Sequence, residues 1–350
     1  MCRYGENISD QETRRQVNET DPEIKSSSTV KRWMKFAFRI LLTAGLLVLL
    51  FRQVNWYTVW DVVKTLDGGL LAATCLMWLP TQYLQYLKWD LLAREAGENI
   101  SRADIRRGYW VGFTLGLITP GRIGQIGRAL ALHNCSLPKA FGLSAVERGY
   151  TAIIINAMGL LSLVMLPLLG WIPPLPIANV FLQIAFAATG LFLILLGLFP
   201  RMMLRPLHAV VRWLPYREKL EQAVNVIENT GPRRGSILLS LSAASMFTSL
   251  FQFVLFIRAA GADIPVFSGM LAALLTFFLK GAIPISVGSL GVGEWAAVFC
   301  LGGLGVMPSV AVASSLLLFT LNVFIPSLIG LPFIGTLRIP HLSKSHPMNP

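Results

Sequence analysis

The chain has 350 residues, of which 54% are hydrophobic and only 14% are charged, and its formal net charge is +12. Soluble domains carry about 25% charged residues, and a mean hydropathy of +0.60 leaves too little polar surface to cover a water-exposed fold. These values exclude an ordinary soluble enzyme and a disordered chain. Runs of about 20 apolar residues, the length that crosses a bilayer, predict an all-α polytopic membrane protein.

The basic residues lie mainly in the segments that flank the apolar runs. This placement is typical of topology signals and of contacts with anionic lipid, and it argues against nucleic-acid binding. The four cysteines and the four histidines are scattered along the chain without paired spacing. The sequence therefore predicts no disulfide framework, no metal site and no cofactor.

Residues 1–30 are polar and lack periodicity, which predicts a disordered cytoplasmic tail. We expect a single transmembrane domain over residues 31–338 and a short cytoplasmic tail over 339–350. Six full spans are predicted within the domain, at residues 33–51, 70–89, 151–171, 177–199, 236–257 and 310–335. Residues 201–234 are basic and place apolar side chains on one helix face, which predicts a cytoplasmic amphipathic loop: an interfacial helix or a small packed loop domain.

Two further apolar segments, 108–119 and 267–283, are too short or too broken to count among these spans. Each runs into a stretch with the spacing Pro-x3-Gly-x2-Gly, first at Pro120, Gly124 and Gly127 and again 164 residues later at Pro284, Gly288 and Gly291. We interpret the two regions as re-entrant hairpins, 108–134 and 267–306. Hairpins that enter from opposite sides form an inverted repeat, in which broken helices meet near the membrane midplane.

With two hairpins and six spans, both termini lie on the same side of the membrane. The Lys and Arg residues around the spans then divide into 22 on the side of the termini and 3 on the other side. An excess of positive charge near span ends marks the cytoplasmic side. The expected location is therefore a cell membrane (inner or plasma membrane) with both termini in the cytoplasm. Two full crossings in place of the hairpins fit the charge count equally well, whereas one of each does not.

Four stretches along the chain resemble a known family. They are Lys88-Trp89, residues 119–125 (TPGRIGQ) with Arg128, Glu147-Arg148, and residues 284–294 (PISVGSLGVGE). Together they resemble the flippase-like transmembrane domain of lysylphosphatidylglycerol synthetases, which also occurs in stand-alone membrane proteins. The resemblance implies movement of a lipid headgroup between leaflets. The chain ends at Pro350, so we expect the aminoacyl-transferase half of the synthetases to be absent.

The chain departs from the family pattern at two places. The family usually has an acidic residue where this chain has Gln125, and an Asp often follows the Glu-Arg pair where this chain has residues 149–151 (GYT). A mechanism that depends on these carboxylates would therefore not apply unchanged to this chain.

Two cations lie deep in the predicted hairpins. At about 1.5 Å per helical residue, Arg122 and Lys280 each lie roughly 20 Å from the membrane surface. A cation at that depth costs at least ~2.5 kcal/mol on insertion scales, which favours a functional role. The expected substrate-binding residues are Arg122, Lys280, Glu294, Gln125, Arg128, Gly124, Gly127, Gly288 and Gly291, with Pro120 and Pro284 shaping the hairpins.

Structural alternatives remain open for each of these residues. Lys280 with Glu294, or Arg122 with Glu147, would form internal ion pairs that only hold the hairpins in place. Glu294 would cap the helix that it opens, and the glycines would serve close helix packing. The adjacent Glu147 and Arg148 are interpreted as a solvated pair at the membrane interface.

The function predicted from these features is that of a lipid or lipid-linked-saccharide translocase, which moves an anionic headgroup through a midplane site. The alternatives are a non-transporting membrane partner of a glycosyltransferase or lipid synthase, and a small-solute transporter. An enzyme is not expected, because no Asp or His lies at depth in a predicted span. The expected partners are anionic membrane lipids and not nucleic acid, and the oligomeric state is left open.

Overall fold

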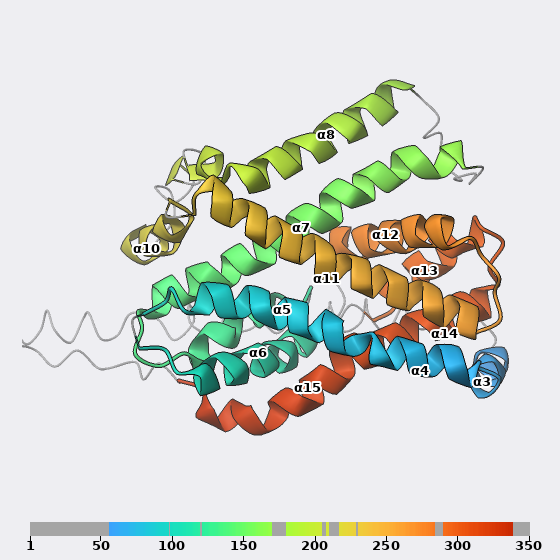
Figure 1. Ribbon diagram of the computed structural model, residues 1–350, viewed down its shortest axis with the longest axis horizontal. Helices are drawn as coiled ribbons and strands as arrows, with labels where there is room; N and C mark the ends of the chain where they lie inside the picture. The colour runs from blue at the N-terminus through green and yellow to red at the C-terminus, as the bar shows by residue number, and fades with distance from the viewer. Residues whose placement is uncertain are drawn as a thin grey trace, which may run out of the picture.

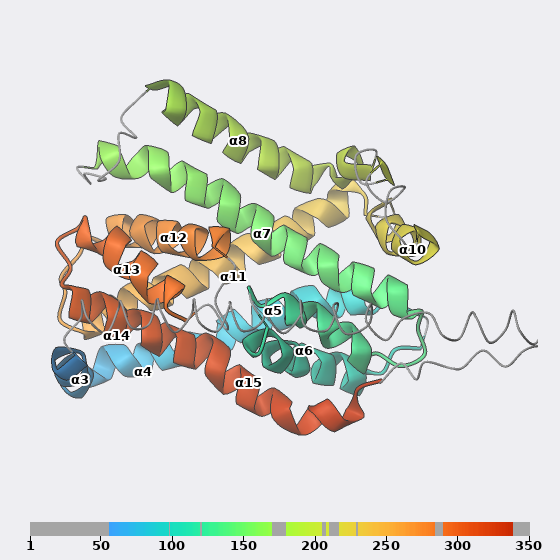
Figure 2. The same ribbon diagram turned by 180° about the vertical axis from the view of Figure 1, so that it is seen from behind.

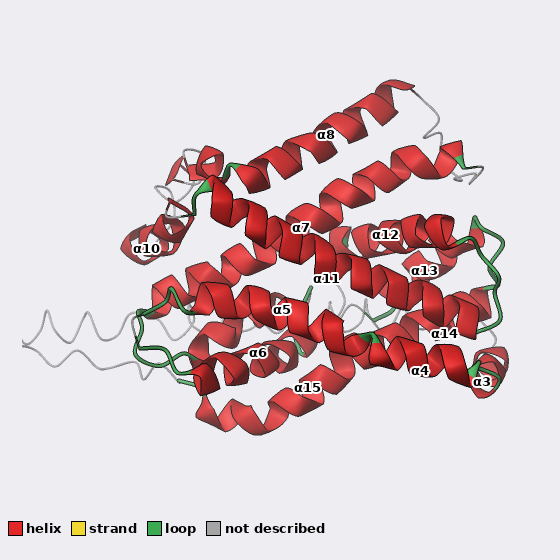
Figure 3. Ribbon diagram, viewed as in Figure 1, coloured by secondary structure: helices red, strands yellow, loops and turns green. Residues whose placement is uncertain are grey.

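The computed structural model describes residues 56–97, 99–119, 121–169, 180–204, 208–209, 217–228, 230–283 and 290–338. Every regular element in these ranges is helical (Figure 3). The first predicted span, 33–51, and both predicted tails lie outside the described residues. The all-helical membrane architecture expected from composition is therefore confirmed for the described part of the chain.

Four helices are long and apolar enough to cross a membrane. They are α7 (Leu137–Leu168), α8 (Val180–Leu198), α11 (Pro232–Ala259) and the continuous run Pro308–Thr336. Pro lies in the first turn of α7, α11 and the last run, where a missing backbone N–H costs nothing because that group has no helical partner. The sequence placed the start of the third span at 151, but α7 begins fourteen residues earlier, so its charged residues lie inside a long helix.

A fifth candidate span begins with a sharp bend. Helix α3 (Trp56–Lys64) meets the run of α4 (Gly68–Leu76) and α5 (Trp78–Ala93) at 85°. The last run is not a regular α-helix throughout. Helix α14 (Pro308–Phe319) continues through a π-helical turn, η3 (Thr320–Phe324), into α15 (Ile325–Gly330) and the 3-10 segment η4 (Leu331–Thr336). Pro326 follows the π turn, consistent with a residue that cannot donate a helical hydrogen bond.

The first predicted hairpin is a pair of antiparallel segments. Helix α6 (Arg102–Leu117) turns back into the 3-10 segment η1 (Ile123–Ala131), which packs along it. A Cβ added to Gly108 would lie 3.0 Å from the carbonyl oxygen of Arg128, and one added to Gly124 would lie 2.2 Å from that of Leu115. The small residues therefore allow the two backbones to approach closely.

The second predicted hairpin contains two short α-helices. Helix α12 (Val266–Ala282) packs against α13 (Val292–Gly302), and both are shorter than a full span. Residues 284–289, which join them, lie outside the described residues. In Figures 1 and 2 α6 and α12 start near opposite ends of the long axis, and each runs toward the middle of the bundle.

The two ends of the bundle differ in charge. The end that carries the start of α6, the start of α7 and the start of α11 also carries α10 (Arg217–Glu228) and the short turn η2 (Pro200–Met203) (Figure 1). The basic residues at this end include Arg94, Arg102, Arg107, Lys139, Arg201, Arg233, Arg234 and Arg338. Helix α10 packs against α7 and buries Val224 and Val226, so the predicted amphipathic helix is held against the bundle.

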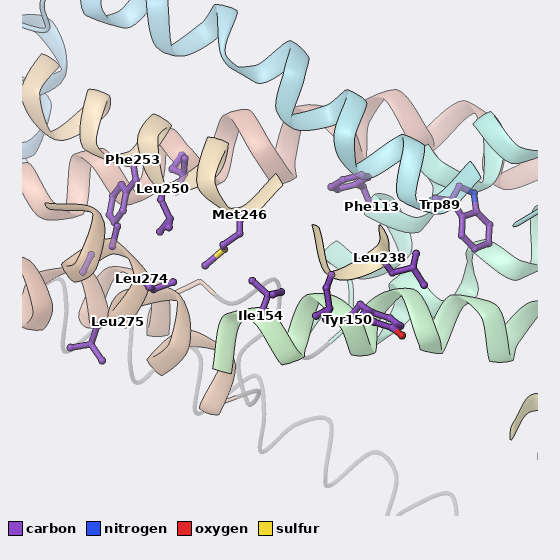
Figure 4. Close-up of a cluster of buried hydrophobic side chains, with 14 of the residues drawn as sticks. Trp89, Phe113, Tyr150, Ile154, Leu238, Met246, Leu250, Phe253, Leu274 and Leu275 are labelled. Carbon is purple, nitrogen blue, oxygen red and sulfur yellow. The ribbon is translucent and has the colours of Figure 1, made fainter. Parts of the chain in front are cut away.

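Buried apolar side chains join these elements into one core. Phe253, Leu250, Leu274 and Leu275 gather between α11 and α12, whereas Trp89 and Leu238 lie toward the other end (Figure 4). Helix α8 lies at one edge of the bundle (Figures 1 and 2), and many of its large apolar side chains are exposed. The exposed apolar surface is that expected of a helix that faces lipid.

Candidate functional site

A cavity of about 340 Å³ lies in the bundle between the two hairpins. Its walls come from α5, the tip of the α6–η1 pair, α7, α11, the end of α12 and the junction of α14 with the π turn. Arg122 from the first hairpin and Lys280 from the second both line it. The fold thus brings together the two deep cations that the sequence singled out, although they are 158 residues apart.

The centre of the charged wall is a buried carboxylate. Glu147 Oε1 lies 2.8 Å from Lys88 Nζ, and Glu147 Oε2 lies 3.3 Å from the guanidinium of Arg128. All three residues are buried, and Lys88 Nζ also donates to Thr151 Oγ1 at 2.5 Å. The expectation that Glu147 belongs to a solvated interfacial pair is therefore wrong: it lies in the third turn of α7, roughly 15 Å along that helix.

Arg148 uses a different partner. Its guanidinium donates to Oε1 of Gln125 at 2.5 Å, and Gln125 itself is buried on η1. Arg128 also donates from Nε to the backbone oxygen of Gln125 at 3.0 Å. The neutral amide at position 125 therefore orients a cation without neutralising its charge.

Arg122 lies at the tip of the first hairpin in a left-handed conformation, with φ of 58°. Its guanidinium is 5.7 Å from the ring of Phe113, and its buried Nε has no hydrogen-bond partner. No carboxylate of the described residues forms an ion pair with it, so the internal Arg122–Glu147 pair is absent from that part of the chain. Because Arg122 lines the cavity, its charge can interact with a ligand bound there.

Lys280 is equally without a carboxylate partner among the described residues. Its Nζ lies 6.0 Å from the centre of the Phe319 ring and packs close to Gly293. Glu294, the alternative partner, instead accepts from the backbone N–H of Gly291 at 2.6 Å and from Ser315 Oγ at 3.3 Å. Glu294 is buried and does not line the cavity, so the structure favours the capping interpretation over substrate binding.

The glycines of the predicted site have mainly packing roles. Gly124 and Gly127 press against Leu115 of α6 and do not line the cavity. Gly291 has φ of 82° at the start of α13, where the backbone requires a residue without a Cβ. Gly288, Pro120 and Pro284 lie outside the described residues.

Several cavity residues were not predicted from the sequence. The sequence places Lys88 among the topology charges and in a stretch that resembles the family, but not among the substrate-binding residues, although a lysine within a helix five residues before its end is itself a signal of depth. Uncharged polar residues on α5, α7, α11 and the π turn also line the cavity: Gln85, Thr151, Asn156, Ser242, Ser245, Ser249 and Asn322. Their spacing along α11 places the three serines on one face of that helix.

The charge of the cavity wall is strongly unbalanced. Among the described residues, five cationic side chains line it, namely Lys88, Arg122, Arg128, Arg148 and Lys280, against the single carboxylate of Glu147. The described residues contain no cluster of His, Cys, Asp and Glu that would hold a metal ion. Chemically, the arrangement is suited to binding an anion that presents several oxygen acceptors.

Residues 36–330 match the family described as the lysylphosphatidylglycerol synthase TM region. A search of curated proteins finds no match to the chain. The family match covers most of the chain, including every described residue of the cavity wall, and agrees with the resemblance carried by the hairpin motifs. The chain therefore belongs to the lysylphosphatidylglycerol synthase transmembrane-region family.

Proposed function

We propose that this protein translocates a lipid or lipid-linked saccharide with an anionic headgroup between the leaflets of a cell membrane. The observation that carries the proposal is the cavity wall, whose described residues include five cations and one carboxylate inside a bundle of apolar helices. Membership of a membrane-embedded, lipid-related family supports the same assignment.

The physical argument is the cost of the surplus charge. Lys88 and Arg128 share Glu147, but Arg122 and Lys280 have no carboxylate partner among the described residues. An unpaired cation in a membrane interior is costly unless it meets water, a counter-charge or a ligand. A phosphate group satisfies both residues, with Arg122 as a planar donor of two hydrogen bonds and Lys280 as a point charge.

The two hairpins supply a route to the cavity. In the proposal they are re-entrant, one from the cytoplasmic side and one from outside, and their tips meet at the site between the leaflets. Broken helices of this kind mark substrate sites in transporters with inverted repeats. The starts of α6 and α12 near opposite ends of the long axis support this arrangement (Figures 1 and 2).

The proposal is tested by leaflet exchange of a labelled anionic lipid in proteoliposomes. Arg122→Gln and Lys280→Gln should each slow exchange by about tenfold or more, since a lost charged hydrogen bond is worth more than 1.4 kcal/mol. Both variants should melt at or above the wild-type temperature, because removing an unpaired cation relieves a desolvation cost. Lys64→Gln, which removes an exposed cation on α3, serves as the matched control and should exchange at the wild-type rate.

Folded Arg122→Gln and Lys280→Gln proteins that exchange at the wild-type rate would refute the proposed site. The absence of exchange in the wild-type protein would instead favour the non-transporting partner of a glycosyltransferase or synthase.

A further inference from the structure

Beside its cations, the cavity carries a set of uncharged hydrogen-bonding groups. Ser242, Ser245 and Ser249 face it from α11, Thr151 and Asn156 from α7, and Gln85 from α5. A wall that only attracted a phosphate would not need hydroxyl and amide groups from three helices. Their presence indicates that the ligand carries polar groups besides its charge.

Three of these groups have hydrogen-bonding capacity to spare. The hydroxyl of Ser242 is buried, with 1% of the residue exposed, and has no hydrogen-bond partner in the described structure. Asn156 donates from Nδ2 to the backbone oxygen of Ala152 at 2.7 Å, which leaves its Oδ1 available. The Gln85 amide makes no hydrogen bond with the described residues. A buried hydroxyl without a partner costs stability, so a ligand hydroxyl that pairs with Ser242 removes that cost.

Among the described residues, the wall has no carboxylate that is free to pair with a ligand ammonium group. Among the described residues that line the cavity, Glu147 is the single carboxylate, and both of its oxygens face cations, at 2.8 Å and 3.3 Å. An amine in this cavity would meet a surplus of positive charge.

We propose that the cavity selects a phosphate ester of a polyol, such as a glycerol or sugar phosphate, and rejects headgroups that carry a primary ammonium group. This inference rests on the proposed function, because it names the class of headgroup that the same site binds. Cations hold the phosphate, while Ser242, Asn156 and Gln85 exchange hydrogen bonds with hydroxyls, which both donate and accept. An aminoacyl ester of the headgroup, such as the lysyl ester in the family's name, would place its ammonium among like charges.

Binding, measured apart from transport, tests the inference. The full chain is placed in nanodiscs of phosphatidylcholine, and native mass spectrometry records competition among phosphatidylglycerol, phosphatidic acid, phosphatidylethanolamine and lysylphosphatidylglycerol. We expect phosphatidylglycerol to bind at least ~tenfold more tightly than either amine-bearing lipid, as repulsion between like charges in a desolvated site requires. The Arg122→Gln/Lys280→Gln double variant identifies the signal that comes from the cavity rather than from surrounding lipid.

Ser242→Ala isolates the role of the hydroxyls. The variant should bring the ratio of phosphatidylglycerol to phosphatidic acid binding toward one, because phosphatidic acid has no headgroup hydroxyl. Ser236→Ala, on the same helix but away from the cavity, should leave that ratio as in the wild type. Soluble glycerol 3-phosphate, added as a competitor, distinguishes a free phosphate ester from a lipid headgroup: displacement of the lipid would indicate that the headgroup alone suffices.

Equal or tighter cavity binding of lysylphosphatidylglycerol or phosphatidylethanolamine would overturn the inference, as would a ratio insensitive to Ser242→Ala. These outcomes are independent of transport. A protein that binds phosphatidylglycerol selectively but does not exchange it would contradict the proposed function and leave the headgroup assignment standing.

Discussion

Glu147 is the residue on which the charged wall depends. It is 4% exposed and lies between Lys88 and Arg128, which are also buried. Such a triad gains little net stability from its ion pairs, because three groups have been removed from water. Loss of the shared carboxylate should be strongly destabilising, since it leaves two buried cations without their counter-charge.

We expect Glu147→Gln to destabilise the protein by about 3–5 kcal/mol, the cost of breaking a buried pair from one side. The measurement is the melting midpoint of the detergent-solubilised protein, together with its yield from the membrane. Asp61→Asn removes the carboxylate of the exposed pair with Lys64 and provides the control, for which little change is expected. A Glu147→Gln protein as stable as the Asp61→Asn protein would show that Lys88 and Arg128 do not rely on this carboxylate.

At the scale of residues, depth along a helix was the useful signal in the sequence. Arg122 and Lys280 follow uninterrupted apolar stretches, so their distance from the surface could be counted directly. Glu147 could not be placed in this way, because α7 continues through polar residues to Leu137 and the apolar run alone hides its true start. The ion-pair partners Lys88 and Glu147 are 59 residues apart, and only the packing of α5 against α7 brings them together.

At the scale of elements, the first hairpin is held by backbone proximity. Gly124 has no room for a side chain, because an added Cβ would lie 2.2 Å from the Leu115 carbonyl oxygen and 2.6 Å from Thr119 Oγ1. Thr119 Oγ1 itself accepts from the Gly124 N–H at 2.7 Å, which ties the turn to η1. A methyl group at this position would force η1 away from α6.

Gly124→Ala should therefore destabilise the protein by about 1–3 kcal/mol, the usual range for overpacking, and should weaken lipid binding because Arg122 moves with the turn. Gly149→Ala is the matched control: an added Cβ meets nothing within 4 Å on α7, and alanine favours a helix interior. Melting midpoints of the two variants decide the matter. If the Gly124→Ala and Gly149→Ala proteins had the same melting midpoint, η1 would accommodate the added methyl group without loss of stability.

The sequence predicted the bounds of long helices better than the breaks in helical geometry within them. Spans 177–199 and 236–257 coincide closely with α8 and α11, because each apolar run is bounded by Pro, Gly or charge. The π turn at Thr320–Phe324 left no clear periodic signal, since the residues on both sides are uniformly apolar. Such a run shows that a helix is present but does not show which residues face the cavity.

At the scale of the whole molecule, the charge pattern predicts an orientation. Four of the basic residues assigned to the cytoplasmic side, Lys88, Arg122, Arg128 and Arg148, line the cavity instead. The remaining described ones still gather at one end of the bundle, whereas Lys64 and Arg258 lie at the other (Figure 1). The rule that relates positive charge to the cytoplasmic side therefore predicts that the end bearing α10 faces inward.

Single cysteines in a chain freed of its own four cysteines test this orientation. Asn225→Cys lies on an exposed site of α10, and Asp263→Cys lies at the opposite end, where the side chain is fully exposed. A membrane-impermeant maleimide should label Asp263→Cys in intact cells and label Asn225→Cys only after the cells are opened. Labelling of Asn225→Cys from outside would reverse the predicted topology.

The backbone at Arg122 has a consequence for how this protein balances durability against activity. A non-glycine residue with φ of 58° holds a conformation that costs of order 1 kcal/mol or more. Glycine would relax the turn, so selection for a robust fold alone would replace the arginine. Under the proposed function, the strained backbone at the tip of the hairpin is the cost of directing the Arg122 guanidinium into the cavity. Selection for stability alone, by consensus or directed-evolution methods, would then tend to replace Arg122 and with it the proposed lipid exchange.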